Sequence, residues 1–145
     1  MTTIMPAGSL FNENFFLKDE ITSLCSDLMY PSESDEKIEY FEMEVSIDER
    51  ISLANFRMFN GIPPEVEIQV MDLELFFKPL IKTEDWFGEE EKKWAEDSLK
   101  LKQLLIEKLK DIEILKVGKI QIEVFLFGKS EYCLWQGVKT KLIET

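Results

Sequence analysis

The stretch TEDWFGEEEKKWAEDSLKLKQLLIEKLK, residues 83–110, decides how the rest of the chain folds, because it holds the longest regular apolar pattern. Its second half repeats large apolar side chains at helical spacing: Trp94, Leu101, Leu104, Leu105 and Leu109. Such a stripe is typical of a helix that lies on a sheet, and the Lys, Glu and Gln residues between favour helix on a solvent-facing side. We predict a long amphipathic helix here, with Thr83 able to cap its start.

The first half of this stretch is acidic and aromatic. Seven carboxylates lie beside only two lysines, Lys92 and Lys93. The acidic residues are Glu84, Asp85, Glu89, Glu90, Glu91, Glu96 and Asp97. Acidic residues suit the first turn of a helix, but that does not explain Trp86 and Phe87 beside them. Two interpretations stay open for Trp86: an aromatic anchor for a basic partner, or a side chain tucked into the protein's own core.

Composition narrows the function classes. With 145 residues, 45% of them hydrophobic, the chain is long enough for one compact domain. Seventeen basic against 29 acidic residues give a net charge of -12, which disfavours direct binding to nucleic acid or to an anionic membrane and favours a basic protein partner. No stretch is as long and apolar as a membrane helix, and the start lacks the pattern of a signal peptide, so we expect a cytoplasmic protein.

Cysteine and histidine usage argues against an enzyme. Cys25 and Cys133 each lie in an apolar pattern, which favours two buried thiols over a disulfide or half of a metal site. The sequence has no histidine, so the commonest metal ligand and the commonest general base near neutral pH are both missing. We therefore expect no catalytic residues, no cofactor and no metal ion of the protein's own.

Patterning along the chain predicts an α+β fold. Before the long helix we expect a loose leader at 1–14 and a helix at 15–29. A hairpin follows, with strands at 41–47 and 51–60 and a turn at Asp48 and Glu49. An extended piece at 66–70 then leads to a short helix capped by Asp72. After it come strands at 112–117, 120–127 and 133–143, a three-strand meander. We predict a mixed or antiparallel sheet covered by helices, within a single domain over residues 15–145.

The loop PSESDE, residues 31–36, places Glu33 and Asp35 close together. Paired carboxylates occur in acid–base catalysis and in calcium loops, but this loop lacks the twelve-residue calcium frame and any visible group that would shift a pKa. From these residues alone an ordinary solvated loop is the favoured interpretation.

The closing stretch KTKLIET, residues 139–145, is unusual because a predicted strand runs almost to Thr145. A residue held in this way could offer its oxygens to a magnesium ion bound by another protein, since magnesium takes oxygen ligands and often keeps open positions. The alternative is an ordered tail without function.

From residue 30 onward, the chain resembles the nuclease A inhibitor family, small acidic cytosolic proteins that block a sugar-nonspecific endonuclease of the ββα-metal class. Four motifs in the family's order and spacing carry the resemblance: SES at 32–34, Asp85 and Trp86 followed by the acidic run 89–91, GKIQIEVFLFG at 118–128 and TKLIET at 140–145. Residues 46–70 match poorly, and residues 1–14 look like an addition.

The resemblance implies a function and a set of contacts. It implies an inhibitor of a nonspecific, metal-dependent DNA and RNA endonuclease, with a helix–sheet–helix sandwich similar to the PR-1 arrangement. By position, Glu33 would enter the active site where the scissile phosphate sits, the hydroxyl of Thr145 would ligate the nuclease's magnesium, and Asp85 with Trp86 would form a second contact. The chain would thus imitate the backbone of DNA.

Two other functions are compatible with the residues. An acidic interaction module with an unrelated basic partner would depend on Trp86 and on salt, and would not need Thr145. An enzyme would need Glu33 and Asp35 as an acid–base pair.

Overall fold

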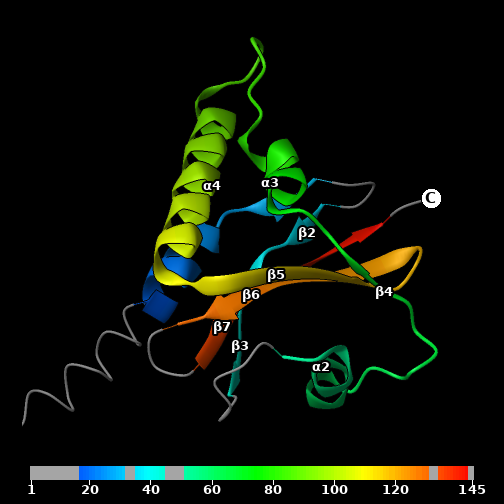
Figure 1. The fold of residues 1–145 in the computed structure, drawn as a ribbon. Helices are drawn as coiled ribbons and strands as arrows, with labels where there is room; N and C mark the ends of the chain where they lie inside the picture. Colours follow the sequence, from blue (N-terminus) through cyan, green and yellow to red (C-terminus); the bar gives the residue numbers. More distant parts are fainter. Residues whose placement is uncertain (1–16, 32–34, 45–50, 131–133, 144–145) are drawn as a thin grey trace, which may run out of the picture.

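A five-stranded antiparallel sheet forms the middle of the molecule (Figure 1). The computed structural model describes residues 17–31, 35–44, 51–130 and 134–143. The strands lie in the order β3-β7-β6-β5-β4. Their bounds are Glu39–Glu44 for β3, Ile68–Val70 for β4, Lys110–Val117 for β5, Gln121–Lys129 for β6 and Leu134–Ile143 for β7. The predicted α+β class and the meander of the last three strands are confirmed.

Helices cover both faces of this sheet (Figure 1). On one face lie a helix at residues 17–25, α3 (Leu73–Ile81) and α4 (Glu89–Lys108), which enclose the larger apolar core. On the other face α2 (Leu53–Asn60) covers a smaller core rich in aromatic side chains. The result is a three-layer arrangement of helices, sheet and helix.

The long helix α4 carries the predicted stripe. Leu101 and Leu105 are fully buried, Leu109 is buried at the helix end, and Trp94 and Leu104 pack partly buried against the same core. The predicted cap at Thr83 is wrong, because the helix begins at Glu89. There the main-chain N–H of Gly88 donates to the Glu91 carboxylate at 3.2 Å, which satisfies one of the free donors at the helix start.

The predicted strand at 51–60 is wrong, because these residues form α2. Ser52 caps the helix by accepting a hydrogen bond from the N–H of Asn55 at 3.1 Å, and Gly61 ends it in the left-handed region with φ 64°. Within this helix Phe56 is fully buried in the core. No hairpin therefore forms between 41–47 and 51–60, and the predicted turn at Asp48 and Glu49 lies outside the described residues.

The first predicted helix is too long. It runs over residues 17–25 in the described part of the chain, and Met29–Tyr30 form a short strand, β1, that pairs with β2 (Glu36–Lys37). Asp72 precedes α3 as expected but makes no side-chain capping hydrogen bond.

Cys25 is a buried free thiol, as predicted, and its burial raises the pKa of the thiol to about 12. Cys133 and the leader at 1–14 lie outside the described residues.

Within the described ranges, no helix is both long enough and apolar enough to span a membrane.

Candidate functional site

Of the four residues predicted to contact a partner, the structure describes two. Asp85 and Trp86 lie in the connection between α3 and α4, whereas Glu33 and Thr145 lie outside the described residues. The strands that lead to Glu33 and to Thr145 are described, however. Residues 32–34 connect β1 to β2, and residue 144 follows β7, so the packing of β2 against β7 defines the base of the candidate site.

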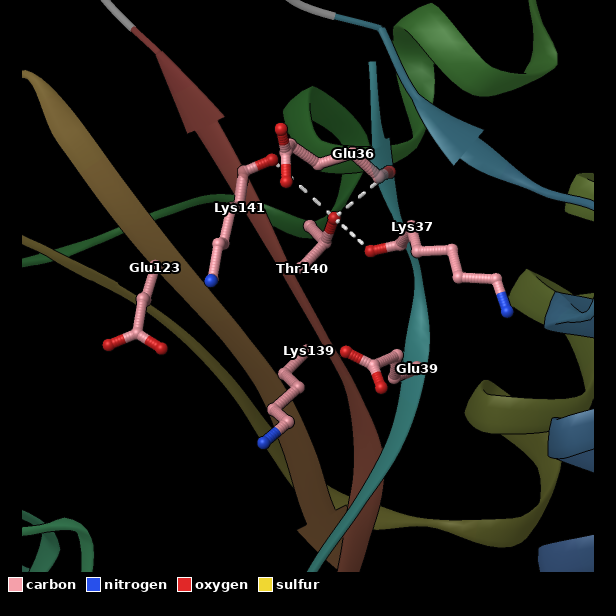
Figure 2. A pocket seen from close by; sticks show the side chains of 7 residues that line it. All are labelled: Glu36, Lys37, Glu39, Glu123, Lys139, Thr140 and Lys141. Carbon is pink, nitrogen blue, oxygen red and sulfur yellow. Dashed lines mark hydrogen bonds between the residues drawn. The ribbon is translucent and has the colours of Figure 1, made fainter. Parts of the chain in front are cut away.

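A buried threonine joins β2 to β7 (Figure 2). The hydroxyl of Thr140, which is only 4% exposed, donates to the carbonyl oxygen of Lys37 at 2.8 Å and lies 3.5 Å from that of Glu36. The β1–β2 hairpin has just two residue pairs of its own, so it depends on contacts of this kind. Thr140 thereby fixes the hairpin against the end of the C-terminal strand.

Alternation along β7 explains why a threonine occupies this position. Val138, Thr140 and Leu142 are buried on the face shared with α3 and α4, while Figure 2 shows Lys139 and Lys141 pointing to the other side of the strand. A pocket of about 220 Å³ lies here. Its charged side chains are three glutamates and three lysines, Glu36, Glu39, Glu123, Lys37, Lys139 and Lys141. Their opposite signs balance, so this pocket does not select for an ion.

A second contact ties the hairpin to α3. The hydroxyl of Tyr30 in β1 donates to the carbonyl oxygen of Phe76 at 2.8 Å, and their ring centroids lie 4.9 Å apart. The helix α3 in turn packs along α4, with an ion pair of 2.7 Å between Lys102 and Glu74. Figure 1 shows the hairpin beside α3, whose chain continues into the connection before α4. One continuous set of packed elements therefore supports the end of β7, the hairpin and the segment with Trp86.

The connection at residues 82–88, which we call the acidic turn, presents its aromatic group to solvent. It is closed by a hydrogen bond of 3.0 Å from the N–H of Phe87 to the carbonyl oxygen of Glu84. Trp86 is 74% exposed, and its ring and that of Phe87 are nearly perpendicular, with centroids 4.7 Å apart. The interpretation that tucked Trp86 into the core is wrong. A large exposed indole on an ordered turn is instead a common feature of binding surfaces.

The carboxylates around Trp86 are incompletely neutralised. Lys82 pairs with Glu84 at 3.0 Å, but Asp85, Glu89 and Glu90 are exposed and form no ion pair within 4.0 Å in the part of the chain that the structure describes. Anionic side chains at the start of α4 are stabilised by the helix dipole, which lets them stay together without cations. The acidic turn and the first residues of α4 thus form a negative surface with an exposed indole.

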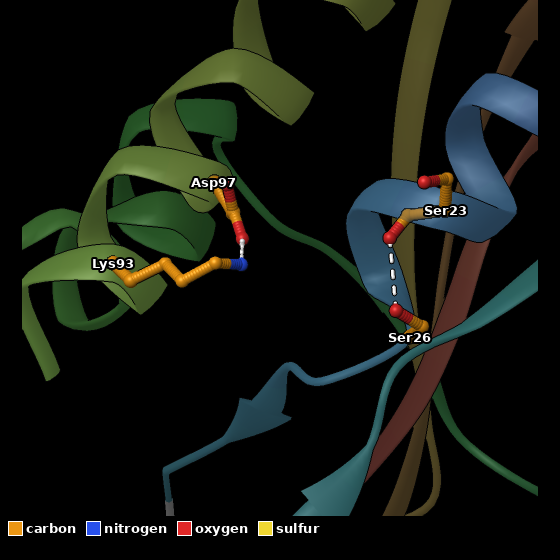
Figure 3. A network of polar contacts seen from close by, with 4 residues as sticks. All are labelled: Ser23, Ser26, Lys93 and Asp97. Carbon is orange, nitrogen blue, oxygen red and sulfur yellow. Dashed lines mark hydrogen bonds and ion pairs between the residues drawn. The ribbon is translucent and has the colours of Figure 1, made fainter. Parts of the chain in front are cut away.

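One of the two lysines near the start of α4 is paired within the helix. Lys93 donates to Asp97 one turn further along the helix at 2.9 Å, and this hydrogen bond raises the pKa of Lys93 (Figure 3). The pair lies across from the end of the helix at 17–25, where the hydroxyl of Ser26 donates to the carbonyl oxygen of Ser23. Lys93 is therefore committed within α4. Lys82 and Lys92 remain beside five carboxylates, those of Glu84, Asp85, Glu89, Glu90 and Glu91, so the surface keeps a net negative charge.

Sequence reasoning missed the residues that hold the site together. Thr140 lies within the predicted strand 133–143, but the sequence does not reveal its role, because its acceptor lies in a hairpin whose residues read as the end of a helix and a loop. A hydroxyl flanked by Val138 and Leu142 on a buried face was the available signal, since a buried hydroxyl needs a partner. Tyr30, beside Pro31, also carries a hydroxyl that needs a partner when it is buried.

Among the described residues, no three acidic, cysteine or histidine side chains gather as a metal site would require.

A family model described as "Nuclease A inhibitor-like protein" matches residues 16–145. No curated protein matches the chain.

Proposed function

Since that match covers nearly the whole chain, the protein belongs to the nuclease A inhibitor-like family, and we propose that it inhibits a nonspecific, metal-dependent nuclease by occupying its active site. Membership in a family of inhibitors also argues that the protein is not itself an enzyme. The proposed target is a nuclease of the ββα-metal class, whose cleft holds a divalent cation and binds the DNA or RNA backbone.

In the proposed complex, two oxygen-bearing groups replace parts of the substrate. Glu33 takes the place of the scissile phosphate, and the hydroxyl of Thr145 ligates the magnesium of the nuclease. The observation that carries this proposal is the hydrogen bond from Thr140 to Lys37. It anchors the base of the β1–β2 hairpin, which leads to residue 33, beside the end of β7, which leads to residue 145. Both groups then start from the same end of the sheet and can enter one cleft.

Asp85 and Trp86 supply a second contact in this proposal. Their exposure, and the exposed carboxylates of Glu89 and Glu90 at the start of α4, suit the positively charged rim of a cleft that binds nucleic acid. The net charge of -12 would steer the protein toward such a cleft, with association rate constants that can reach about 10⁸ to 10⁹ M⁻¹s⁻¹ at low salt.

Rigidity favours tight binding by this mechanism. Because Thr140 and Tyr30 already fix the hairpin on β7 and α3, little conformational entropy is lost when the two proteins dock. A trapped substrate mimic of this kind also resists cleavage, since the groups at the phosphate site belong to a carboxylate and a hydroxyl and not to a phosphodiester.

The decisive experiment measures DNA cleavage by a purified ββα-metal nuclease in the presence of the inhibitor. Four proteins are compared: the intact chain, the chain without Thr145, Glu33→Ala, and Asp35→Ala as a matched loss of charge from the same loop. We expect at least tenfold weaker inhibition for the first two variants and little change for Asp35→Ala. Equal inhibition by all four proteins, with the fold intact by circular dichroism, would show that the proposed mechanism is wrong.

A second function, an acidic interaction module with an unrelated basic partner, is favoured by one observation. The exposed Trp86 and its carboxylates form a binding surface that needs neither Glu33 nor Thr145. In that case, deletion of Thr145 has no effect on partner binding, whereas Trp86→Ala and added salt both weaken it. The same panel of variants therefore separates the two functions.

A further inference from the structure

The turn between β5 and β6, residues 118–120, presents an isoleucine to solvent. Ile120 is 61% exposed, and the exposed polar residues Lys119 and Gln121 flank it in the chain. The apolar residues that follow in β6 are explained by the fold, because Ile122 and Val124 are buried in the larger core. Ile120 has no such role. A single exposed aliphatic side chain is ordinary, so its meaning depends on where the turn lies and how firmly it is held.

Backbone contacts hold this turn in place. Gly118 has φ 109°, in the region that favours glycine, and a Cβ atom there would lie 2.6 Å from the carbonyl oxygen of Gln121. The N–H of Gly118 donates to the carbonyl oxygen of Glu67 at 2.9 Å, which joins the turn to the residue before β4. The amine of Lys119 lies 4.0 Å from the carboxylate of Glu67. Ile120 is therefore carried by an ordered turn, so little conformational entropy would be lost if a partner covered it.

The turn lies beside the end of β7. In the register of β6 and β7, Gln121 is opposite Ile143, so Ile120 directly precedes the part of β6 that flanks the last described residues of the chain. A pocket of about 520 Å³ is lined by the start of β6, the end of β7 and Glu36 of β2. Figure 1 shows the turn and the arrowhead of β7 at the same side of the sheet. Ile120 thus belongs to the same end of the molecule as the base of the candidate site.

We propose that Ile120 is a further contact residue of the inhibitor and packs against an apolar patch on the nuclease, beside the metal site. This inference rests on the proposed function, which brings the end of β7 into the cleft. An apolar side chain flanked by polar ones has the arrangement of a binding hot spot, in which a ring of polar contacts keeps water from an apolar centre. The negative charges of the chain then speed association, whereas the contact at Ile120 slows dissociation.

Charge favours the nuclease over a second copy of this chain as the partner at Ile120. Two copies, each with a net charge of -12, repel one another, so the turn is poorly suited to self-association. A basic cleft attracts the chain instead. Once the end of β7 enters that cleft, the neighbouring turn meets its rim, and Ile120 is the large apolar side chain that the turn presents there.

Inhibition of a purified ββα-metal nuclease by Ile120→Ser and Ile120→Asp tests the proposal. We expect about tenfold weaker inhibition for serine and a larger loss for aspartate, because both remove the apolar contact and aspartate also buries a charge. The sign of the aspartate effect separates two explanations. If the turn acted through charge alone, an added carboxylate would strengthen binding to a basic cleft. Ile120→Val keeps an apolar side chain and should inhibit nearly as well as the unaltered protein.

Ile106→Ser and Ile106→Asp are the matched controls. Ile106 is 51% exposed near the end of α4, which leads into the start of β5. The eight residues of β5 span about 25 Å, so Ile106 and the turn lie at opposite ends of this strand. Both control variants should leave inhibition unchanged. Because Ile120 is mostly exposed, its variants should unfold in urea as the unaltered protein does, which excludes unfolding as the cause of weaker inhibition.

Deletion of Thr145 separates a failure of this inference from a failure of the proposed function. If the deletion weakens inhibition while both Ile120 variants inhibit as the unaltered protein does, the contact at Ile120 is refuted and the inhibitor function stands. If the Ile120 variants weaken inhibition and the deletion does not, the contact is supported and the proposed role of Thr145 is refuted. If none of these changes weakens inhibition, both proposals fail.

Two further outcomes would refute the contact. Equal losses for the Ile106 and Ile120 variants would show that the effect is not localised at the turn. A change in oligomeric state of Ile120→Ser by analytical ultracentrifugation, with inhibition unchanged, would assign the turn to a second copy of the chain.

Discussion

The hydroxyl of Thr140 lies 2.8 Å from the carbonyl oxygen of Lys37, and 103 residues separate the two in the sequence. This hydrogen bond connects the final strand to a hairpin that has only two residue pairs of its own. It is therefore the contact most directly responsible for how the hairpin is held relative to the end of β7.

Replacing Thr140 by valine should weaken inhibition more than it weakens the fold. Valine keeps the shape of the side chain but leaves the Lys37 carbonyl without its donor, which costs about 1 kcal/mol or more of stability. We expect roughly tenfold weaker inhibition of the nuclease at a temperature where the variant remains folded, since the hairpin is no longer fixed. Inhibition constants and urea unfolding measure the two effects.

Thr140→Ser is the control for this prediction, because serine retains the hydroxyl. It should recover most of the inhibition. If valine and serine inhibit equally well, the hydrogen bond stabilises the fold without positioning the hairpin.

Truncation of Trp86 should affect binding and not stability. Its side chain is 74% exposed, so Trp86→Ala removes little buried surface and should change the free energy of unfolding by less than about 0.5 kcal/mol. As a binding anchor it should cost about 2 kcal/mol of affinity, or roughly thirtyfold. Phe59→Ala on α2, where the side chain is 48% exposed, is a matched aromatic control and should bind as the unaltered protein does. Similar losses for both variants would contradict a localised contact.

The negative surface beside Trp86 predicts a salt-dependent association rate. Glu89→Gln with Glu90→Gln should slow association severalfold at about 0.01 M salt, where charges interact over about 30 Å, and much less at 0.15 M. Asp19→Asn with Glu20→Gln removes the same charge from the helix at 17–25 and should have a smaller effect. Stopped-flow measurements over a range of salt concentrations test this. Equal slowing by both pairs would mean that only the net charge matters.

Burial of Cys25 predicts a loss of stability at alkaline pH. The pKa of this thiol rises from its usual 9.0 to about 12 in the folded protein, so between these values the unfolded chain releases a proton that the folded chain keeps. Stability should therefore fall from pH 9 toward pH 12, by up to about 1.4 kcal/mol per pH unit from this group. Urea unfolding at pH 8 and pH 10 should show a smaller decline for Cys25→Ala. An identical decline in both proteins would be inconsistent with the raised pKa.

The elements with long, regular apolar patterns could be predicted from sequence. The stripe through Leu101 and Leu105 predicts α4, and the predicted strand at 120–127 corresponds to β6, because each pattern extends over several turns or residue pairs. These two elements are enough to give the α+β class.

The region of α2 was assigned wrongly because short apolar segments fit either period. Phe56 is the buried residue of this helix, so its burial gives little periodic signal. The ends were more informative than the middle: Ser52 supplies the cap, and Gly61 supplies the left-handed residue that terminates the helix. The absence of β-branched residues from Leu53–Asn60 was a further sign against a strand.

The base of the candidate site could not be predicted because it depends on contacts distant in sequence. Met29–Tyr30 have no strand pattern of their own. They are extended because the Tyr30 hydroxyl donates a hydrogen bond to α3, and because their partner strand, β2, accepts one from Thr140. In contrast, Asp85 and Trp86 could be singled out from the sequence, since an aromatic residue beside carboxylates stands out there. The exposure of Trp86 became known only from the structure.

The position of β3 in the sheet affects how the chain can be synthesised. This strand lies at the edge, and its single neighbour in the five-stranded sheet is β7, with Glu44 opposite Leu134. On a ribosome, residues 39–44 emerge long before their partner, so Phe41 and Met43 stay unpaired during most of translation. The two glutamates that alternate with them, Glu42 and Glu44, would discourage premature pairing with other nascent chains.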